Sequence, residues 1–535
     1  AATGKLLWSV QTIPHDDARY ITGPPWAFDG KVAIGFGGAD FDMVRGYVTV
    51  YDARTGRQLW RFYTVPGNPA DGFENATMRR AARTWKGEWW RFGGAGGTVW
   101  HAMAYDRKFN RLLIGTGNGA PWNQKIRSPG GGDNLFLCSI VALDADTGRY
   151  VWHYQVNPGE TWDFNAAMDI QFAELPIRGR MRSVILHAPK NGFFYMLDRR
   201  TGKLLSAEKF TKVTWAERID LKTGRPVEAP GARYEDGKGV LLFPGPVGAH
   251  SVQAMSFNPL TRLVYIPVTE LGATYADPEG DLMQWRPKPF RVINNGVARP
   301  PIPIPPGSSS LLAWDPVRQR AAWSVPLQGT VNGSTMTTAG NLVFQGQVTG
   351  EFSAYAADSG RKLWSFDAQA GIQAQPITYL VDGRQYVTVI AGWRGMGSAS
   401  GAVPDWDYRL QPRRVLTFTL DGTAALPPPG PRTADFVDDP SFVVDPTKAE
   451  IGRAKVAAHC TLCHGVGLVS GGTAPDLRKS GLTLSLEALT TVLKDGVLVP
   501  AGMPQFAEFT AEEIEGIHHY IRQQTRTAMA ATAAH

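Results

Sequence analysis

A short turn-and-tryptophan pattern recurs along this chain and constrains its fold more than any other feature. Most copies place Asp, then Thr or Ser, Gly and a basic residue ahead of a strand-like run. Asp or Ser bonds its own backbone in such a turn, and Gly adopts the positive φ that follows. The copies are YDARTGRQLW ending at Trp60, ALDADTGRYVW at Trp152, MLDRRTGKLL at Leu205, LLAWDPVRQRAAW at Trp323 and AYAADSGRKLW at Trp364.

Each copy follows a β-branched or aromatic run such as GYVTVYD, so we predict a strand, a tight turn and a second strand. The Trp of the second strand is expected to pack across a neighbouring sheet. Repeats spaced by roughly 40–50 residues, with longer gaps where a copy has decayed, indicate four-stranded propeller blades. An ordinary β-sandwich is the alternative, which the joint recurrence of turn and Trp disfavours. The first residues, AATGKLLWSV, fit the same pattern and predict a turn feeding a strand.

Length and composition agree with a large all-β body. The chain has 535 residues, enough for one large domain and a small one, and 59 Gly, 38 Pro and 17 Trp suit a loop-rich β fold. The formal net charge is +7, but there is no Lys/Arg run and no nucleic-acid-binding motif, so we expect no nucleic-acid partner. No apolar run is long enough to predict a membrane span.

A Pro-rich polar segment, DGTAALPPPGPRTADFVDDP, separates two regions of different character. It predicts a stiff linker. After it, PTKAEIGRAKVAAHC and TAEEIEGIHHYIRQQ have helical spacing, and Thr510 with Glu513 predicts a capping box. We therefore divide the chain into an all-β propeller at 1–423, a linker at 424–446 and an all-α domain at 447–535.

The helical domain contains the strongest chemical signal, HCTLCHG, with Cys460, Cys463 and His464. A Cys-x-x-Cys-His run is the attachment site of a c-type haem. A zinc site needs a second pair of ligands, and no other Cys lies nearby. A redox dithiol would lie in a βαβ context, which the sequence does not indicate. Downstream, PAGMPQF places Met503 in a Pro-flanked loop, so we predict His464 and Met503 as the two iron ligands. Covalent haem c implies an exported protein, here periplasmic.

A cytochrome domain needs an electron source, so we expect a redox cofactor in the β body. GTGNGA and GGAGG are strand-end loops and do not open a βα unit, which disfavours a nicotinamide or flavin site. The third cysteine, Cys138, lies in the strand-like run LFLCSIVAL. It is predicted to be a small buried apolar residue.

The chain resembles the quinohaemoprotein alcohol dehydrogenases, which hold pyrroloquinoline quinone (PQQ) in an eight-bladed propeller ahead of a C-terminal cytochrome c. The resemblance covers nearly the whole chain. It implies PQQ, calcium and covalent haem c as cofactors, a small-molecule alcohol as substrate, and an electron acceptor such as a cytochrome, a cupredoxin or a quinone. It is carried by GGTVWHAMAYD, LLIGTGNGAPWN, RSPGGGDNLFLCSIVALD, TWDFN, APKNGFFYMLDR, NLVFQG and AGWRG.

The same resemblance implies which residues bind the cofactor. Trp100 would be the floor on which the quinone stacks, a task that suits a large flat indole. Thr98 would bond a cofactor edge oxygen, and Lys190 would lie against the quinone oxygens. Gly38 and Ala39 would line the same site. Taken singly, such residues are more often structural, but their order along the chain favours the functional interpretation.

The resemblance also implies a metal site and a base. Asn118, Asp40 and Asp163 would be the calcium ligands, since this cation prefers oxygen. The cation would polarise a quinone carbonyl, and Asp163 would also take the hydroxyl proton of the alcohol while hydride passes to the quinone. Electrons would then pass singly to the haem.

Several positions depart from the family pattern. Asp40 stands where Glu is usual, and Asp42 is the alternative ligand. Asn165 stands where relatives that use lanthanides have an added carboxylate, so calcium is the expected metal. His101 stands where Asp is common, and GAHSVQ, with His250, Ser251 and Val252, replaces a usual His-Asn-Trp. Both places suggest a bulkier or secondary alcohol as substrate.

Within the family, AATGKLLWSV matches a blade turn well inside the mature protein. The resemblance therefore implies earlier blades, with an adjacent-cysteine pair and a Glu and an Arg that bind the cofactor. Three accounts follow: a fragment, which we favour, a separate chain that supplies the blades, or a smaller closed ring.

The alternative function is a non-catalytic or incomplete propeller scaffold that carries a mono-haem electron-transfer domain. A second alternative keeps the chemistry but acts on a cyclic amine or a polymeric alcohol.

Overall fold

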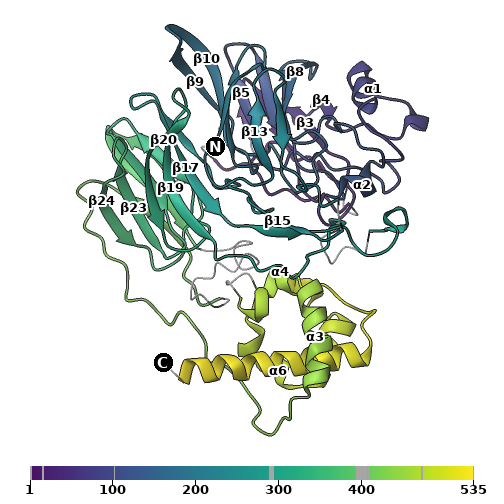
Figure 1. Cartoon of the computed structure of the whole chain (residues 1–535). Coiled ribbons are helices and arrows are strands. Elements are labelled where there is room, and N and C mark those ends of the chain that lie inside the picture. Colours follow the sequence, from purple (N-terminus) through teal and green to yellow (C-terminus); the bar gives the residue numbers. More distant parts are fainter. Residues whose placement is uncertain are drawn as a thin grey trace. The chain divides into compact units, whose positions relative to one another are not determined.

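The computed structural model describes residues 3–14, 17–101, 103–235, 237–287, 294–392, 407, 409–470 and 474–533. The chain divides into two compact units, coloured along the sequence in Figure 1. Unit 1 comprises Ala1–Pro326, Thr337–Val343 and Ala356–Gly360, and unit 2 comprises Leu327–Met336, Phe344–Tyr355 and Arg361–His535.

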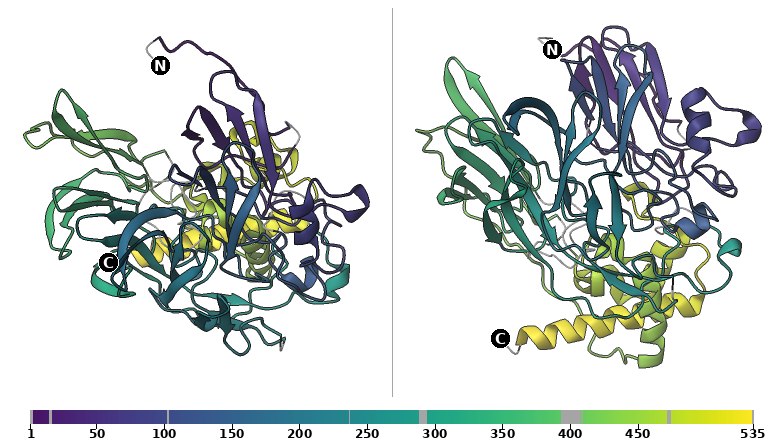
Figure 2. Two further views of the ribbon diagram at one scale, coloured as in Figure 1. Left: turned by 90° about the horizontal axis from the view of Figure 1, so that it is seen from above. Right: turned by 45° about the horizontal axis from the view of Figure 1, so that its top comes forward.

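Four-stranded antiparallel sheets make up most of unit 1, and Figure 2 gives two further views of them. In three of the sheets the strands are hydrogen-bonded in chain order, and in the fourth, β16-β17-β19-β20, one strand that pairs elsewhere lies between in sequence. The strands are β1 (Trp26–Phe28), β2 (Lys31–Ile34), β3 (Tyr47–Asp52) and β4 (Gln58–Tyr63); β5 (Met103–Asp106), β6 (Arg111–Gly115), β7 (Ser139–Asp144) and β8 (Tyr150–Gln155); β9 (Gln171–Ile177), β10 (Arg180–His187), β11 (Phe193–Asp198) and β12 (Leu204–Lys209); and β16 (Ser256–Asn258), β17 (Leu263–Glu270), β19 (Ser308–Asp315) and β20 (Arg320–Leu327).

Smaller elements connect these sheets. Two of the sheets have only two strands, which are β13 (Ala216–Asp220) with β14 (Arg225–Glu228), and β15 (Val240–Leu242) with β18 (Ala273–Tyr275). The short helices of unit 1 are η1 (Pro69–Asp71), α1 (Ala76–Ala82), α2 (Gln124–Arg127) and η2 (Leu282–Gln284).

The last sheets follow the same plan. Residues of the four-stranded sheet β21 (Thr335–Thr338), β22 (Leu342–Gly346), β23 (Glu351–Ala356) and β24 (Lys362–Asp367) are shared between the two units. The three-stranded sheet of unit 2 contains β25 (Ile377–Val381), β26 (Arg384–Ala391) and β27 (Arg414–Phe418). Repeated four-stranded antiparallel sheets are propeller blades, so the predicted fold class is confirmed.

The repeated turns have the predicted chemistry. Asp52, at the end of β3, accepts hydrogen bonds at Oδ1 from Thr55 N at 2.8 Å and Thr55 Oγ1 at 2.8 Å. Gly56 then has a φ of 72°, which favours glycine. Asp144 and Thr147 repeat the arrangement between β7 and β8, with distances of 2.9 and 2.7 Å.

Tryptophans of two repeats, Trp60 and Trp323, hydrogen-bond to the backbone of the next repeat. The Trp60 indole N–H donates to Ala145 O in the next repeat at 3.2 Å. A Cβ on Gly148 would lie 2.6 Å from the Trp60 ring, so the turn glycine is also the docking surface of the indole. Trp323 and Ala357 repeat the hydrogen bond at 3.1 Å. The predicted packing of Trp across a neighbouring sheet is therefore confirmed.

The predicted strand at the start of the chain is wrong. No strand is assigned to residues 3–14, and Leu6 and Leu7 are 75% and 80% exposed. A strand requires a hydrogen-bonded neighbour. Within the described residues, no backbone–backbone hydrogen bond pairs residues 5–10 with another strand. Only the repeat's tryptophan behaves as expected, because the Trp8 indole N–H donates to Ala53 O at 3.0 Å.

The C-terminal part of unit 2 is helical. Figure 1 shows the long helix α6 (yellow) passing across α3. The two backbones touch where both helices have glycine, since a Cβ on Gly452 would lie 2.0 Å from Gly516 O. The helices and short helical turns are α3 (Pro446–His459), α4 (Thr461–His464), η4 (Val466–Leu468), η5 (Leu477–Lys479), η6 (Gly481–Leu484), α5 (Leu486–Thr490), η7 (Thr491–Asp495), η8 (Val499–Ala501) and α6 (Ala511–Ala533).

Local signals explain where the two main helices begin. Thr510 N donates to Glu513 Oε2 at 2.9 Å and Glu513 N donates to Thr510 Oγ1 at 3.2 Å, which confirms the capping box. Asp445 caps α3 through its carboxylate, and Pro446 occupies the first turn. Asp438, near the end of the Pro-rich segment, accepts a hydrogen bond from Arg526 Nε on α6 at 2.8 Å. The domain boundaries remain predictions.

The sequence predicts no membrane span. Among the residues that the structure describes, none of the helices combines the length and apolarity that a bilayer crossing requires.

Candidate cofactor and haem-attachment sites

Three oxygen-bearing side chains predicted as metal ligands lie in unit 1. Asp40 Oδ1 accepts hydrogen bonds from Asn118 Nδ2 at 3.0 Å and from the Trp122 indole N–H at 2.7 Å. Asp42, the alternative ligand, is exposed and accepts a hydrogen bond from the neighbouring Met43 N at 2.8 Å. The structure therefore brings Asp40, and not Asp42, to Asn118.

The hydrogen bonds of this group leave acceptor oxygens unused. Asp40 Oδ2, Asn118 Oδ1 and Asp163 Oδ1 accept no hydrogen bond from any described residue. The described residues contain no group of three or more His, Cys, Asp or Glu side chains suited to a metal. A site here would combine two carboxylates with an amide oxygen, a donor set that fits a hard cation.

Asp163 lies in the turn after β8 and is held in place by a lysine. Lys190 Nζ donates to Asp163 Oδ2 at 3.0 Å and to Asp163 O at 3.3 Å. The φ of Asp163 is 71°, an uncommon conformation for a residue with a side chain. Gly248 lets Lys190 take this position, because a Cβ there would lie 2.4 Å from Lys190 Cγ. The Asn165 amide N–H₂ also donates to Asp163 O, at 3.4 Å.

The electrostatics of Asp163 suit a proton acceptor. Burial raises its pKa well above the ordinary value, and the nearby carboxylates of Asp40 and Glu160 raise it further. Lys190 acts in the opposite direction, because its charge and hydrogen bond stabilise the carboxylate. Burial and the neighbouring carboxylates thus favour the neutral form of Asp163, and Lys190 favours the carboxylate. A strongly shifted pKa of this kind is typical of functional sites.

Trp100 lies among backbone segments that carry glycine. A Cβ on Gly117 would lie 3.4 Å from Trp100 Cδ1, and one on Gly37 would lie 3.6 Å from Trp100 Cβ. Thr98 is 2% exposed, and its carbonyl accepts a hydrogen bond from Gly117 N at 2.9 Å. The Thr22 hydroxyl donates to Trp100 O at 3.2 Å, a neighbour that the sequence prediction missed.

Gly38 and Ala39 lead directly into Asp40. Gly38 has a φ of 119°, and a Cβ there would lie 2.9 Å from Ala18 O, so only glycine fits this turn. Its carbonyl accepts a hydrogen bond from Phe41 N at 3.1 Å, which closes the turn around Asp40. Ala39 is 3% exposed. The two residues therefore set the direction of the Asp40 side chain.

His101, which stands where Asp is common, and His250 both lie near one half-buried carboxylate. His101 Nε2 and His250 Nε2 each lie 4.0 Å from a carboxylate oxygen of Asp169. Asp169 Oδ2 also accepts a hydrogen bond from Met255 N at 2.7 Å. The His101 ring stacks on Trp100 with a centroid distance of 5.7 Å. Asp169 was not predicted from the sequence, because its role depends on histidines far away along the chain.

Glu160 is a second carboxylate that sequence reasoning missed. It has no exposed surface and accepts hydrogen bonds from Trp162 N at 2.6 Å, Phe164 N at 3.0 Å and Gly119 N at 3.1 Å. Burial raises its pKa, while the charge of buried Arg127 and these backbone donors lower it. Its place three residues before Asp163 was the only sequence signal.

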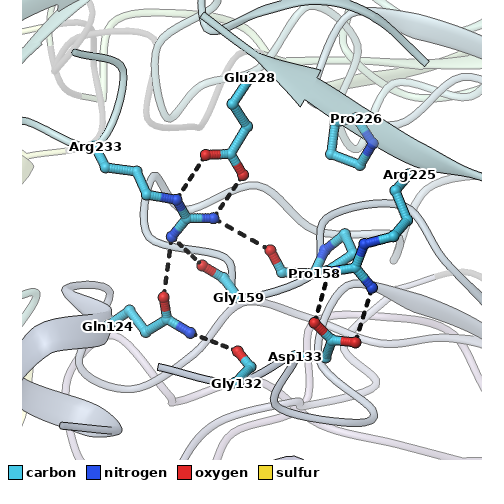
Figure 3. A pocket seen from close by; sticks show the side chains of 9 residues that line it. All are labelled: Gln124, Gly132, Asp133, Pro158, Gly159, Arg225, Pro226, Glu228 and Arg233. Atoms are coloured by element: carbon cyan, nitrogen blue, oxygen red, sulfur yellow. Dashed lines mark hydrogen bonds and ion pairs between the residues drawn. The ribbon is translucent and has the colours of Figure 1, made fainter. Parts of the chain in front are cut away.

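The chain segment before Glu160 is held from outside by arginine (Figure 3). Arg233 donates to Gly159 O at 2.8 Å and to Pro158 O at 3.4 Å, and it pairs with Glu228 at 2.6 Å. These residues line a cavity of about 250 Å³. Its two arginines, Arg225 and Arg233, are both engaged in ion pairs, so we interpret their role as structural. Its lining consists of Gln124, Gly132, Asp133, Pro158, Gly159, Arg225, Pro226, Glu228 and Arg233.

The haem-attachment motif of unit 2 spans the end of α3 and all of α4. Cys460 is 7% exposed, Cys463 is exposed, and neither forms a disulfide. His464 Nδ1 lies 2.7 Å from Pro475 O. If Nδ1 carries the proton for this bond, Nε2 is left with a lone pair for a metal. Burial lowers the pKa of His464, so the neutral form that can ligate iron is favoured.

Met503 follows η8 and packs partly buried against the core that contains Cys460. Met503 N donates to Leu498 O at 3.2 Å, which holds the loop. Two free thiols, an oriented imidazole and a thioether in one small helical body fit a covalently attached haem. Cys138, by contrast, has no exposed surface, and its thiol donates to Phe164 O at 2.7 Å, as expected for a buried small residue.

One motif of the resemblance cannot be placed. In AGWRG, the residues Trp393, Arg394 and Gly395 lie outside the described residues. The other quoted motifs of the β body lie in described strands and turns, apart from Ala102.

A propeller with an oxygen-rich site beside a tryptophan, followed by a helical haem-attachment domain, defines the class of propeller dehydrogenases with a cytochrome. The family model "Glucose/ethanol/alcohol dehydrogenase, beta-propeller domain" matches residues 15–214 and 310–387. The model "Cytochrome C oxidase, cbb3-type, subunit III" matches residues 447–521. With the relatives below, these matches show that the chain belongs to the family of quinohaemoprotein alcohol dehydrogenases.

Curated relatives and solved structures agree. The chain is 49% identical to "Quinohemoprotein alcohol dehydrogenase ADH IIB" of Pseudomonas putida, over 97% of this chain and 75% of that protein. It is 47% identical to "Quinohemoprotein alcohol dehydrogenase ADH-IIG" of the same species, over 97% of this chain and 74% of that protein. A solved structure of ADHIIG from Pseudomonas putida HK5 superposes with a TM-score of 0.89, at 45% identity, over 99% of this chain and 78% of that one.

Proposed function

We propose that this protein is a quinohaemoprotein dehydrogenase that oxidises an alcohol to an aldehyde or ketone. PQQ, calcium and covalent haem c are its cofactors, and the location is the periplasm. Family membership supports the reaction type. The observation that carries the residue assignment is the convergence of Asp40, Asn118, Asp163 and Lys190, with three acceptor oxygens to which no described residue donates.

The metal would be held by Asp40, Asn118 and Asp163. The amide nitrogen of Asn118 is oriented by Asp40 Oδ1 at 3.0 Å and Gly119 O at 3.1 Å, which turns the amide oxygen to the open side. Trp122 fixes the Asp40 carboxylate from the other side at 2.7 Å. When bound, PQQ supplies a two-electron acceptor for hydride, calcium supplies Lewis acidity and haem supplies a one-electron carrier.

Asp163 would act as the base that accepts the hydroxyl proton of the alcohol. Its Oδ1 is the free oxygen, while Oδ2 is held by Lys190 at 3.0 Å. The lysine therefore fixes the carboxylate and favours its ionised form, in opposition to the larger effect of burial, which raises the pKa. Trp100 would provide the flat surface for the cofactor. Thr98, Gly38 and Ala39 would line the cofactor site around it.

In unit 2, Cys460 and Cys463 would form the thioether links. His464 and Met503 would ligate the iron from opposite sides, and Met as the second ligand raises the haem potential. The final acceptor would be a cytochrome, a cupredoxin or a quinone. A bulkier or secondary alcohol is supported by Ser251 and Val252, which stand where Asn and Trp are usual and have smaller side chains.

The test is a visible spectrum of the haem-loaded protein after addition of PQQ, Ca²⁺ and a panel of primary, secondary and bulky alcohols. We expect an alcohol to reduce the haem only when PQQ and Ca²⁺ are both present. No reduction by any alcohol, with a haem that dithionite still reduces, would favour the alternative of a propeller scaffold that carries an electron-transfer domain. Ethanol outperforming every bulkier alcohol would contradict the proposed substrate class.

A further inference from the structure

Glu160 links the two loops that carry the proposed metal ligands. One carboxylate oxygen, Oε1, accepts from Trp162 N at 2.6 Å and Phe164 N at 3.0 Å, on either side of Asp163. The other, Oε2, accepts from Gly119 N at 3.1 Å, directly after Asn118. The side chain is completely buried, so backbone N–H groups replace water as its hydrogen-bond donors.

The countercharge of Glu160 is also completely enclosed. Arg127, at the end of α2, is 1% exposed. Its Nη1 donates to Pro121 O at 2.6 Å and Trp122 O at 2.7 Å, and its Nη2 donates to Glu160 O at 2.5 Å. Trp122 is the residue whose indole fixes Asp40.

Gly119 fits closely between the two charges. A Cβ there would lie 2.2 Å from Arg127 Cζ, so the backbone that carries Asn118 is pressed against the guanidinium. The acid and the base share no direct ion pair among the described residues. The hydrogen bonds of each go mainly to backbone groups, and Arg127 Nε is buried without a partner in the described part of the chain. Charge-assisted hydrogen bonds of this kind are stronger and more directional than neutral ones.

We propose that Glu160, backed by Arg127, is a positioning residue that holds Asn118 and Asp163 at the spacing a cation requires. It touches neither substrate nor cofactor and acts through the backbone of the two loops. The turn at Asp163, with its φ of 71°, needs such outside support, because strained backbone persists only where its surroundings determine it. This inference rests on the proposed metal site.

The test compares Ca²⁺ affinity in wild type, Glu160→Gln and Asp106→Asn. Glutamine keeps the shape of the side chain, but its amide N–H₂ must face an N–H donor on one side. Asp106 is a matched control, since it is also fully buried, accepts from Lys108 N at 2.9 Å and pairs with Arg199 at 2.6 Å. Asp106 holds none of the proposed ligands.

Calcium binding is measured by titration calorimetry on the haem-loaded, PQQ-reconstituted protein after chelation. We expect Glu160→Gln to weaken Ca²⁺ binding at least tenfold and Asp106→Asn to change it less than twofold, although both lower the melting temperature. Equal affinity in Glu160→Gln and wild type would overturn the inference, and so would equal weakening in Asp106→Asn. A wild type that binds no Ca²⁺ would overturn the proposed metal site itself, and the inference with it.

A second measurement needs no variant and so is independent of folding defects. In wild-type protein, we expect the amides of residues 158–166 and 115–120 to be protected from hydrogen exchange to a similar extent with and without Ca²⁺, because Glu160 holds the loops before the cation arrives. Protection that appears only with Ca²⁺ would show that the cation, and not Glu160, orders these loops, and would overturn the inference.

Discussion

Replacing Asp163 with asparagine separates the chemical role of this residue from its structural one. Asparagine has nearly the same shape and keeps the backbone contacts of Asp163 O with Lys190 and Asn165. It removes the negative charge and the ability to take a proton. If Asp163 is the base, the turnover rate should fall by roughly 10²–10⁴-fold, which corresponds to about 3–5 kcal/mol of activation free energy.

The effect on folding has a separate origin, which is the buried ion pair with Lys190. The Lys190–Asp163 pair is 3.0 Å apart, and its attraction is about 5 kcal/mol at an effective dielectric constant of ~20. That gain is opposed by a desolvation penalty of several kcal/mol per buried ion and by repulsion from Asp40 and Glu160. Asp163→Asn removes only the carboxylate and leaves the buried charge of Lys190 without its partner. We therefore expect the free energy of unfolding to fall by about 3–5 kcal/mol.

The assay is the rate of haem reduction by alcohol in the loaded protein, with the melting temperature measured in parallel. Asp144→Asn is the control, because it makes the same substitution in the turn between β7 and β8. It should leave the turnover rate within about twofold of wild type, since it contacts no proposed site residue. An Asp163→Asn protein that keeps more than about a tenth of the wild-type rate would refute the assignment of Asp163 as the base.

Three further substitutions test other parts of the molecule. Met503→Leu should lower the haem reduction potential by on the order of 0.1 V in a redox titration, because the thioether ligand is lost while the volume is kept. Gly452→Ala should destabilise the helical domain by about 1–3 kcal/mol or more, seen as a lower melting temperature, because its Cβ would lie 2.0 Å from Gly516 O. His153 has its pKa lowered from 6.5 to about 4 by burial, so the folded state resists its protonation. The contribution of neutral His153 to the free energy of unfolding should be fully present above about pH 6.5. It should fall by ~1.4 kcal/mol per pH unit between about pH 6.5 and about pH 4. His153→Phe should remove this part of the pH dependence in urea unfolding.

Each of these substitutions has a control or a contradicting outcome. Met529→Leu changes an exposed methionine of α6 and should leave the potential unchanged. A potential that moves equally in both variants would argue against Met503 as a ligand. Gly481→Ala adds a methyl group with no heavy atom within 4 Å and should melt like wild type. For His153→Phe, an unfolding midpoint that depends on pH as steeply as in wild type would contradict the pKa argument.

Much of the fold could be predicted from local patterns. The Asp-Thr-Gly turns and their tryptophans specify hairpins and the contacts between repeats, because both depend on a few residues close in sequence. The capping box at Thr510 and Glu513 likewise requires only two residues one turn apart. The strand expected at Lys5–Val10 did not form, since strand formation depends on a partner that the local pattern cannot supply.

The candidate site could be predicted only in part. Resemblance named Asp40, Asn118, Asp163 and Lys190, and the structure brings them together, but the choice between Asp40 and Asp42 was left open. Only the folded chain shows that Asp40 is bonded to Asn118 while Asp42 faces solvent. The choice between two carboxylates two positions apart depends on how the turn at Gly38 directs each side chain.

What the sequence determined by itself was therefore the repeat architecture, the haem-attachment motif and the residue types available for redox chemistry. The tertiary structure alone decided which of these residues meet. It brought Glu160 and Arg127 under the Asn118 and Asp163 loops and placed His101 and His250 on either side of Asp169. The physical reason is that buried charges are stable only where donors and acceptors from distant segments surround them, and that arrangement exists only in the folded chain.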